Sequence, residues 1–191
     1  MHRKTDTRMG IKMATTMKQR FGFLAALLAG MLSLPLAALE AGDPAPDFSL
    51  PGSDGKTHRL ADYKGDKAVV IAWYPKAFTK GCTIECKSLA EKGHLIRDYN
   101  VAYFMASTDE LETNKEFAEA QQADFPLLSD PQGKVAKAYG VLMPVVNVAK
   151  RVTLYIGKDG RILKVDRDIK PATSAEDIAR TLGELGVERK D

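Results

Sequence analysis

The chain has 191 residues and a net charge of +3, and its hydrophobic (45%) and charged (28%) fractions are those of a globular protein. These values exclude disorder over the whole length, and two cysteines are too few for a disulfide-stapled scaffold. The positive excess lies in residues 1–38, whereas the other 153 residues carry 22 basic and 24 acidic side chains, with no basic patch that would indicate nucleic-acid binding.

The chain begins with features of an export signal. Residues 21–39 are free of charge, Lys18 and Arg20 precede them, and small residues that include Ala38 and Ala41 close the segment. A basic start, an apolar middle and a small-residue exit are typical of a secretory signal peptide. The expected cleavage follows Ala38 or Ala41.

We therefore predict a signal peptide over residues 1–38, of which residues 1–16 would be an over-extended start, and one domain over residues 39–191. The mature protein is expected in the bacterial periplasm, without stable membrane association. The alternative is an uncleaved anchor, because 19 apolar residues nearly reach the roughly 20 that span a bilayer.

The body of the chain predicts a hairpin, then alternating strands and helices, then a second hairpin and a last helix. The expected strands cover residues 47–50, 56–60, 67–74, 101–107, 125–128, 151–156 and 161–165. The expected helices cover residues 82–92, 110–122 and 134–139, and the last helix begins at a capping box of Thr173 and Glu176. This order predicts an α/β three-layer sandwich, whose mixed central sheet has helices on both faces.

One segment carries chemistry: residues 74–86, with the sequence YPKAFTKGCTIEC. Cys82 falls in the first turn of a predicted helix, where unpaired N–H groups and the helix dipole favour an anion and hence a thiolate. Thr79 is close enough to turn its hydroxyl toward the sulfur. Pro75 would rigidify the strand exit and shield the thiolate from water.

The pattern Pro-x3-Thr-x2-Cys resembles the active-site signature of the peroxiredoxins. Segments of matching type and order follow over about 110 residues: Ala45–Phe48, Ser107–Asp109, Phe125–Asp130, Ala138–Val141 and Arg151–Ile156. The resemblance is strongest to the bacterioferritin-comigratory or Q-type branch of the AhpC/TSA superfamily. It implies a thioredoxin-like fold and a thiol-dependent peroxidase.

The resemblance also implies roles for individual residues. Cys82 would be the peroxidatic nucleophile, and Thr79 would hold the thiolate and then the peroxide. Arg151 would favour the thiolate and polarise the O–O bond, Glu85 would orient the arginine, and the N–H groups of Gly81 and Cys82 would bind peroxide. The implied partners are hydrogen peroxide or organic hydroperoxides and a thioredoxin-like or other thiol reductant. We expect a monomer that needs no cofactor and no metal.

Cys86 is the candidate resolving cysteine, although it departs from the family pattern. In the nearest branch the second cysteine often lies five residues after the nucleophile, whereas Cys86 lies four after Cys82. Positions i and i+4 share a helix face at about 6 Å, but the Cβ vectors of an intact helix aim poorly for a disulfide. We expect a Cys82–Cys86 disulfide after local unwinding; the alternative is a buried, inert Cys86.

Two other functions are compatible with an exported domain of this kind. A Cys-x3-Cys pair resembles that of Sco-type copper proteins, and two thiolates suit Cu(I). However, His94 is the only histidine after the cysteines, and none lies in the C-terminal half. A thioredoxin-like disulfide reductase would use Cys-x2-Cys, which is absent. The isolated His58 and His94 are expected at the surface.

Overall fold

The computed structural model describes residues 39–190, so the predicted signal peptide lies outside the described residues. Between these bounds, no helix has the length and apolar character that crossing a membrane requires. A five-stranded sheet forms the centre, in the order β5-β4-β3-β8-β9. Its strands are β3 (Ala68–Trp73), β4 (Val101–Ser107), β5 (Leu127–Ser129), β8 (Val152–Ile156) and β9 (Ile162–Asp166). β3, β4 and β5 are parallel, and β8 is antiparallel to both of its neighbours, as the predicted mixed sheet requires.

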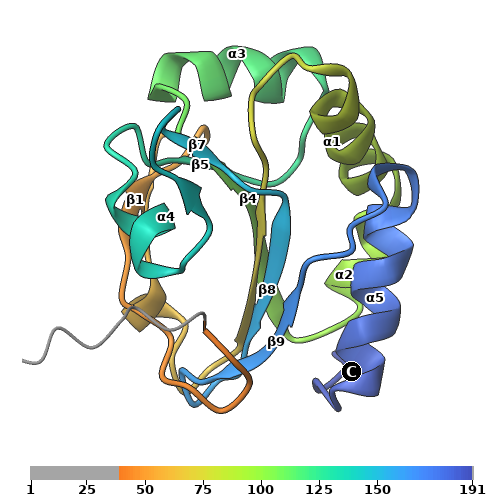
Figure 1. Cartoon of the computed structure of the whole chain (residues 1–191). Helices are drawn as coiled ribbons and strands as arrows, with labels where there is room; N and C mark the ends of the chain where they lie inside the picture. The colour runs from red at the N-terminus through yellow and green to blue at the C-terminus, as the bar shows by residue number, and fades with distance from the viewer. Residues whose placement is uncertain (1–38, 191) are drawn as a thin grey trace, which may run out of the picture. The chain divides into compact units, whose positions relative to one another are not determined.

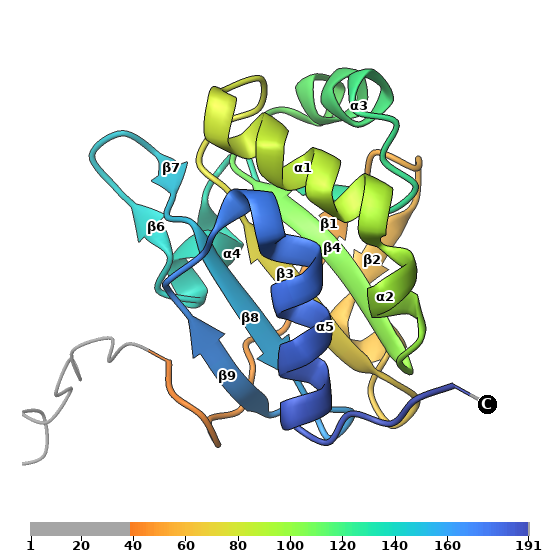
Figure 2. The same ribbon diagram turned by 90° about the vertical axis from the view of Figure 1, so that its right-hand side faces the viewer.

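Helices cover both faces of this sheet (Figure 1). They are α1 (Lys80–Lys92), α2 (His94–Arg97), α3 (Leu111–Ala120), α4 (Lys134–Ala138) and α5 (Ser174–Glu184). Figure 2 shows α1, α2 and α5 side by side in front of the sheet. On the opposite face lie α4 and the hairpin of β1 (Ser49–Pro51) and β2 (Thr57–Arg59), while α3 crosses one end of the sheet (Figure 1).

Two apolar cores follow from the alternation of side chains along the strands. On β3, Val70 and Ala72 join a core that contains both cysteines and the buried faces of α1, α2 and α5. Ile71 and Trp73 point the other way, into a core formed with α4 and the first hairpin. β3 is buried over its whole length, as its continuous apolar run predicts.

The elements after β5 differ most from the sequence-based expectation. A short hairpin of β6 (Leu142–Met143) and β7 (Val148–Ala149) was not predicted, because two-residue strands carry no readable period. The prediction of a capping box formed by Thr173 and Glu176 was wrong. The 3₁₀ turn Pro171–Thr173 runs directly into α5, so Thr173 lacks the extended backbone of a capping residue and makes no side-chain cap. Its hydroxyl donates to Asp177 at 2.7 Å, and Glu176 pairs with Lys92 instead.

Candidate active site

Cys82 lies where the central strand β3 passes through a loop into α1. Its side chain is wholly buried, in the first turn of the helix. The helix begins at Lys80, and Thr79 is the residue before it, with an extended backbone. The first N–H groups of an α-helix have no acceptor within the helix, so Cys82 sits where the backbone favours negative charge.

Arg151, the residue directly before β8, reaches this thiol. Its Nη2 donates a hydrogen bond to Sγ of Cys82 at 3.1 Å, and its Nη1 donates to Oε2 of Glu85. Gly81 makes room for the guanidinium, because a Cβ at this position would lie 3.2 Å from Nη2. The structure therefore brings together three of the residues that the resemblance implied, over 69 residues of sequence in the case of Cys82 and Arg151.

Glu85 is a buried carboxylate directly behind the arginine. It is 0% exposed, and its second oxygen, Oε1, accepts from the hydroxyl of Ser174 at 3.5 Å. Burial raises the pKa of Glu85 to about 7, although the charge and hydrogen bond of Arg151 and the hydroxyl of Ser174 act in the opposite direction. The charge on Glu85, and so the pairing of Arg151, therefore changes near neutral pH.

Thr79 is placed beside the site, but its hydroxyl has a different partner from the one expected. It donates to the backbone carbonyl of Lys76 at 2.9 Å and closes the loop locally, a bond that threonine commonly makes with nearby backbone. Its lone pairs stay free to accept. Pro75 follows Tyr74 at the end of β3 and is half-buried. Its proposed shielding of the sulfur stays a prediction.

The loop that carries these residues is held from the neighbouring strand by Asp109, which our sequence reasoning did not select. The carboxylate of Asp109 is buried and accepts from the backbone N–H of Ala77 at 2.9 Å and from the hydroxyl of Ser107 at 3.0 Å. It also forms an ion pair with Lys76. The match of residues 107–109 to a family segment was the available signal, because an acid directly after a buried strand reaches the same sheet edge as the loop.

A second support lies beneath the loop. The hydroxyl of Tyr74 donates to Oδ1 of Asn114 at 2.6 Å, and the amide of Asn114 donates to Ser129 at 2.8 Å. All three side chains are buried. This network ties β3, α3 and β5 together under the site, and no sequence pattern marked Asn114 as inward-facing.

Cys86 lies one helical turn beyond Cys82 in the same core, and it too is 0% exposed. Burial, then the negative charges of Glu85 and Cys82, raises the pKa of the Cys86 thiol to about 12. Both cysteines are free thiols in this structure. Within the intact helix Cys86 is therefore a protonated, enclosed group, whereas the sulfur of Cys82 has a cation beside it.

On a thioredoxin-like sheet, a thiol at a helix N-terminus with an arginine on its sulfur defines the class of cysteine-dependent redox enzymes. The chain belongs to the AhpC/TSA family, which matches residues 41–165. Peroxiredoxin Bcp of Escherichia coli (strain K12) is 34% identical over 152 residues, which cover 76% of this chain and 97% of that protein. Peroxiredoxin Bcp of Bacillus subtilis (strain 168) is 33% identical over 153 residues, with coverages of 77% and 97%.

Solved structures agree with these sequence relatives. Peroxidoxin BcpB from Mycobacterium tuberculosis superposes with a TM-score of 0.70 at 32% identity, over 76% of this chain and 97% of that one. A mutant of PrxQ from Xylella fastidiosa gives 0.68 at 26% identity, over 78% and 99%. The protein is thus a thiol-dependent peroxidase of the Bcp/Q-type peroxiredoxin branch, as the sequence predicted, and neither alternative function is favoured.

Proposed function

We propose that Cys82 is the peroxidatic cysteine and that it reduces hydrogen peroxide and organic hydroperoxides. The observation that carries this proposal is the 3.1 Å contact between the Arg151 guanidinium and the Cys82 sulfur. The thiolate gives an electron pair to one peroxide oxygen, and the O–O bond breaks. The other oxygen leaves as hydroxide or alkoxide and takes up a proton, while Cys82 becomes a sulfenic acid.

The groups around Cys82 support specific roles in that step. Arg151 stabilises the thiolate and the charge that develops on the departing oxygen. Because the Thr79 hydroxyl already donates to a carbonyl, it would accept the O–H of the peroxide. The backbone N–H groups of Gly81 and Cys82 would donate to the peroxide. Phe78, which is 53% exposed in the same loop, would contact the organic part of a hydroperoxide.

We further propose that Cys86 resolves the sulfenic acid. Its sulfur displaces the hydroxyl group from Cys82, an S–S bond forms and water leaves. A dithiol reductant of the thioredoxin type then returns both cysteines to thiols by exchange. Because Cys86 is enclosed and protonated in the intact helix, this step requires the first turn of α1 to open.

Export to the periplasm and a monomeric state are also part of the proposal. The first described strand begins at Ser49, so cleavage after Ala38 or Ala41 would remove no described strand. N-terminal sequencing of exported protein tests the cleavage, which should remove about 38–41 residues. A membrane-bound chain that keeps its apolar segment would instead support the anchor. Light scattering of the mature protein tests the monomer, which a dimer mass would exclude.

The decisive experiment on the nucleophile uses the Cys82→Ser variant. We expect it to lose turnover of hydrogen peroxide and of cumene hydroperoxide, because an alcohol is not a comparable nucleophile at neutral pH. The matched control is Cys86→Ser, in which the first equivalent of peroxide should still oxidise Cys82 to the sulfenic acid. Appreciable turnover by Cys82→Ser would reject Cys82 as the peroxidatic residue.

A further inference from the structure

We propose that Ser174, the first residue of α5, is a positioning residue of the peroxide site. The hydroxyl of Ser174 donates to Oε1 of Glu85, and Oε2 of Glu85 accepts from Arg151. Arg151 in turn donates to the sulfur of Cys82. This inference rests on the proposed role of Cys82. It adds a residue from the C-terminal helix, 92 positions away along the chain, to the groups that set the reactivity of the thiol.

The hydrogen-bonding requirements of Ser174 and Glu85, both buried, support this role. Ser174 is 2% exposed, and a hydroxyl buried to that extent is expected to find a partner. Among the described residues, its partner is Oε1 of Glu85 at 3.5 Å. Glu85 is fully buried and directs Oε2 to Arg151, so its two oxygens face two different elements. Without the Ser174 hydroxyl, Oε1 would lose its hydrogen bond, and among the described residues only Arg151 would still orient the carboxylate.

The position of Ser174 is fixed by a row of contacts between α1 and α5. The backbone N–H of Ala175 donates to the hydroxyl of Ser88 at 3.2 Å, and Lys92 forms an ion pair with Glu176. Glu85, Ser88 and Lys92 are spaced three and four residues apart, so they lie on one face of α1. Consecutive residues at the start of α5 therefore meet consecutive turns of α1, and the serine is held in place by its neighbours.

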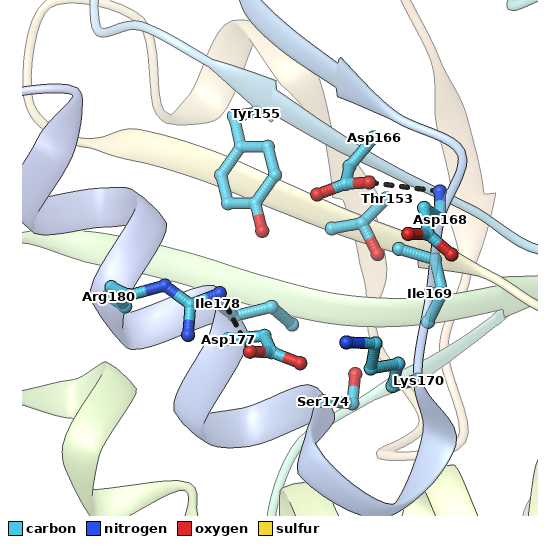
Figure 3. A pocket seen from close by; sticks show the side chains of 10 residues that line it. All are labelled: Thr153, Tyr155, Asp166, Asp168, Ile169, Lys170, Ser174, Asp177, Ile178 and Arg180. Atoms are coloured by element: carbon cyan, nitrogen blue, oxygen red, sulfur yellow. Dashed lines mark hydrogen bonds and ion pairs between the residues drawn. The ribbon is translucent and has the colours of Figure 1, made fainter.

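Ser174 also borders a polar cavity of about 190 Å³ between α5 and the strands β8 and β9. Figure 3 shows Thr153, from the sheet, and Ser174 on opposite sides of it. The Thr153 hydroxyl is buried and has no hydrogen-bond partner within residues 39–190, and a polar space of this size accommodates water. The charged groups that line the cavity are Asp166, Asp168, Lys170, Asp177 and Arg180. Ser174 therefore lies between this polar cavity and Glu85, which does not itself line the cavity.

These contacts predict a specific kinetic signature. As the pH falls through the pKa of Glu85, about 7, the carboxylate becomes neutral and its hold on Arg151 weakens. The groups that act on Glu85 or feel its charge are Arg151, Ser174 and Cys86. Loss of the Ser174 hydroxyl removes a donor that favours the carboxylate. In Ser174→Ala, the acid limb of the rate–pH profile should therefore move to higher pH.

The experiment measures the second-order rate constant for oxidation of Cys82 by hydrogen peroxide between pH 5.5 and 9. We expect the rate of Ser174→Ala to fall about threefold below wild type near pH 6.5 and to approach it near pH 9. Ser174→Thr, which keeps the hydroxyl, should restore the profile. Ser88→Ala is the matched control, because it weakens the same helix contact without touching Glu85 and should leave the limb in place.

A double variant separates positioning from folding. In a Glu85→Gln background the acid limb assigned to Glu85 is absent, so adding Ser174→Ala should not shift the profile. An unshifted profile in the single Ser174→Ala variant, or the same shift in Ser88→Ala, would overturn the inference while leaving the peroxidase proposal intact. If the wild-type Cys82 is itself not oxidised by peroxide, the proposed function fails first, and the two failures are distinguishable.

Discussion

At Arg151, one guanidinium connects the sulfur of Cys82 to the buried carboxylate of Glu85, because its two terminal nitrogens donate in different directions. Arginine suits this position, since its fork is planar and keeps its charge at any physiological pH. A lysine would offer a single ammonium, which could not hold the sulfur and Glu85 in the same geometry. The reactivity of Cys82 should therefore depend on this side chain more than on any other cation near the loop.

The corresponding prediction concerns Arg151→Met. We expect oxidation of Cys82 by peroxide to slow by roughly 10²-fold, the usual scale for losing one preorganised donor to a developing charge. Competition with a second peroxidase, or the fluorescence of Trp73, measures the rate. Arg161→Met is the control, because Arg161 is exposed and bonds to the carbonyl of Gly42. Equal rates for Arg151→Met and wild type would exclude a role of the guanidinium in thiolate activation.

Asp109 is the residue whose loss should loosen the whole active-site loop. Asp109→Ala removes the acceptor of the Ala77 N–H and of the Ser107 hydroxyl and leaves both groups buried, at a cost of about 1–3 kcal/mol. Urea denaturation should show this loss, together with slower oxidation of Cys82. Asp124→Ala, at an exposed ion pair with Arg97, should change stability by less than about 1 kcal/mol. Similar losses in both variants would contradict the support role of Asp109.

At the scale of elements, the proposed mechanism requires the first turn of α1 both to hold the thiolate and to open for resolution. While the turn is formed, Cys82 and Cys86 are buried in one core and the second thiol stays protonated. Opening of the first turn breaks the contact of Cys82 with Arg151, whereas the contacts of α1 with α5 at Ser88 and Lys92 lie in later turns and can stay formed. We therefore expect the turn to hold the thiolate before Cys82 is oxidised and to open afterwards, so that Cys86 can reach it.

This arrangement predicts the products of oxidation. One equivalent of peroxide should give an intact mass lower by about two hydrogens, and a peptide that contains a Cys82–Cys86 bond. Cys86→Ser should form the sulfenic acid with the first equivalent of peroxide, and a second equivalent should then convert it to sulfinic Cys82, because no thiol intercepts it. A wild-type protein that gains one oxygen, or that forms only Cys82–Cys82 dimers, would make Cys86 a packing residue.

The sequence predicted the long helices and strands well, and it failed where short turns and caps decide the local backbone. The continuous run of β3 and the helix after Cys82 were confirmed nearly to their ends. The capping box failed because a 3₁₀ turn before Thr173 changed its backbone. His58, expected at the surface, is buried and bonded to Asp54, in the turn of the first hairpin, and to Tyr63, which follows that hairpin.

At the scale of the molecule, some residues of the candidate site were predictable from the sequence and others were not. The meeting of Cys82, Glu85 and Arg151 was predictable through the family resemblance, and not from spacing. Ser174 was not predictable, because a serine after a proline turn is an ordinary helix start. Its role arises from how α5 lies on α1, and contacts between elements that are distant in sequence leave no local pattern.

Glu85 should also give the whole molecule a pH-dependent stability. An unfolded glutamate ionises near pH 4.5, whereas burial raises the pKa of Glu85 to about 7 in the folded protein. Between these values the folded state keeps a proton that the unfolded state has lost. This contribution is therefore full below pH 4.5 and disappears as the pH rises through 7.

We accordingly expect Glu85→Gln, which mimics the protonated acid, to gain about 1–3 kcal/mol of stability relative to wild type between pH 5 and 8. Urea denaturation at several pH values measures this difference, with Glu119→Gln at an exposed position of α3 as the control. A stability difference between Glu85→Gln and wild type that stays constant across this range would show that the pKa of Glu85 in the folded protein is that of an ordinary glutamate.

The complete enclosure of both sulfurs has a consequence for chemical labelling. Cys82 and Cys86 are each 0% exposed, so a bulky maleimide cannot reach either one while the first turn of α1 is formed. Modification must wait for that turn to open, and at high reagent concentration its rate approaches the opening rate itself. The labelling kinetics of the reduced protein would thus measure the rate of the helix opening that formation of the disulfide requires.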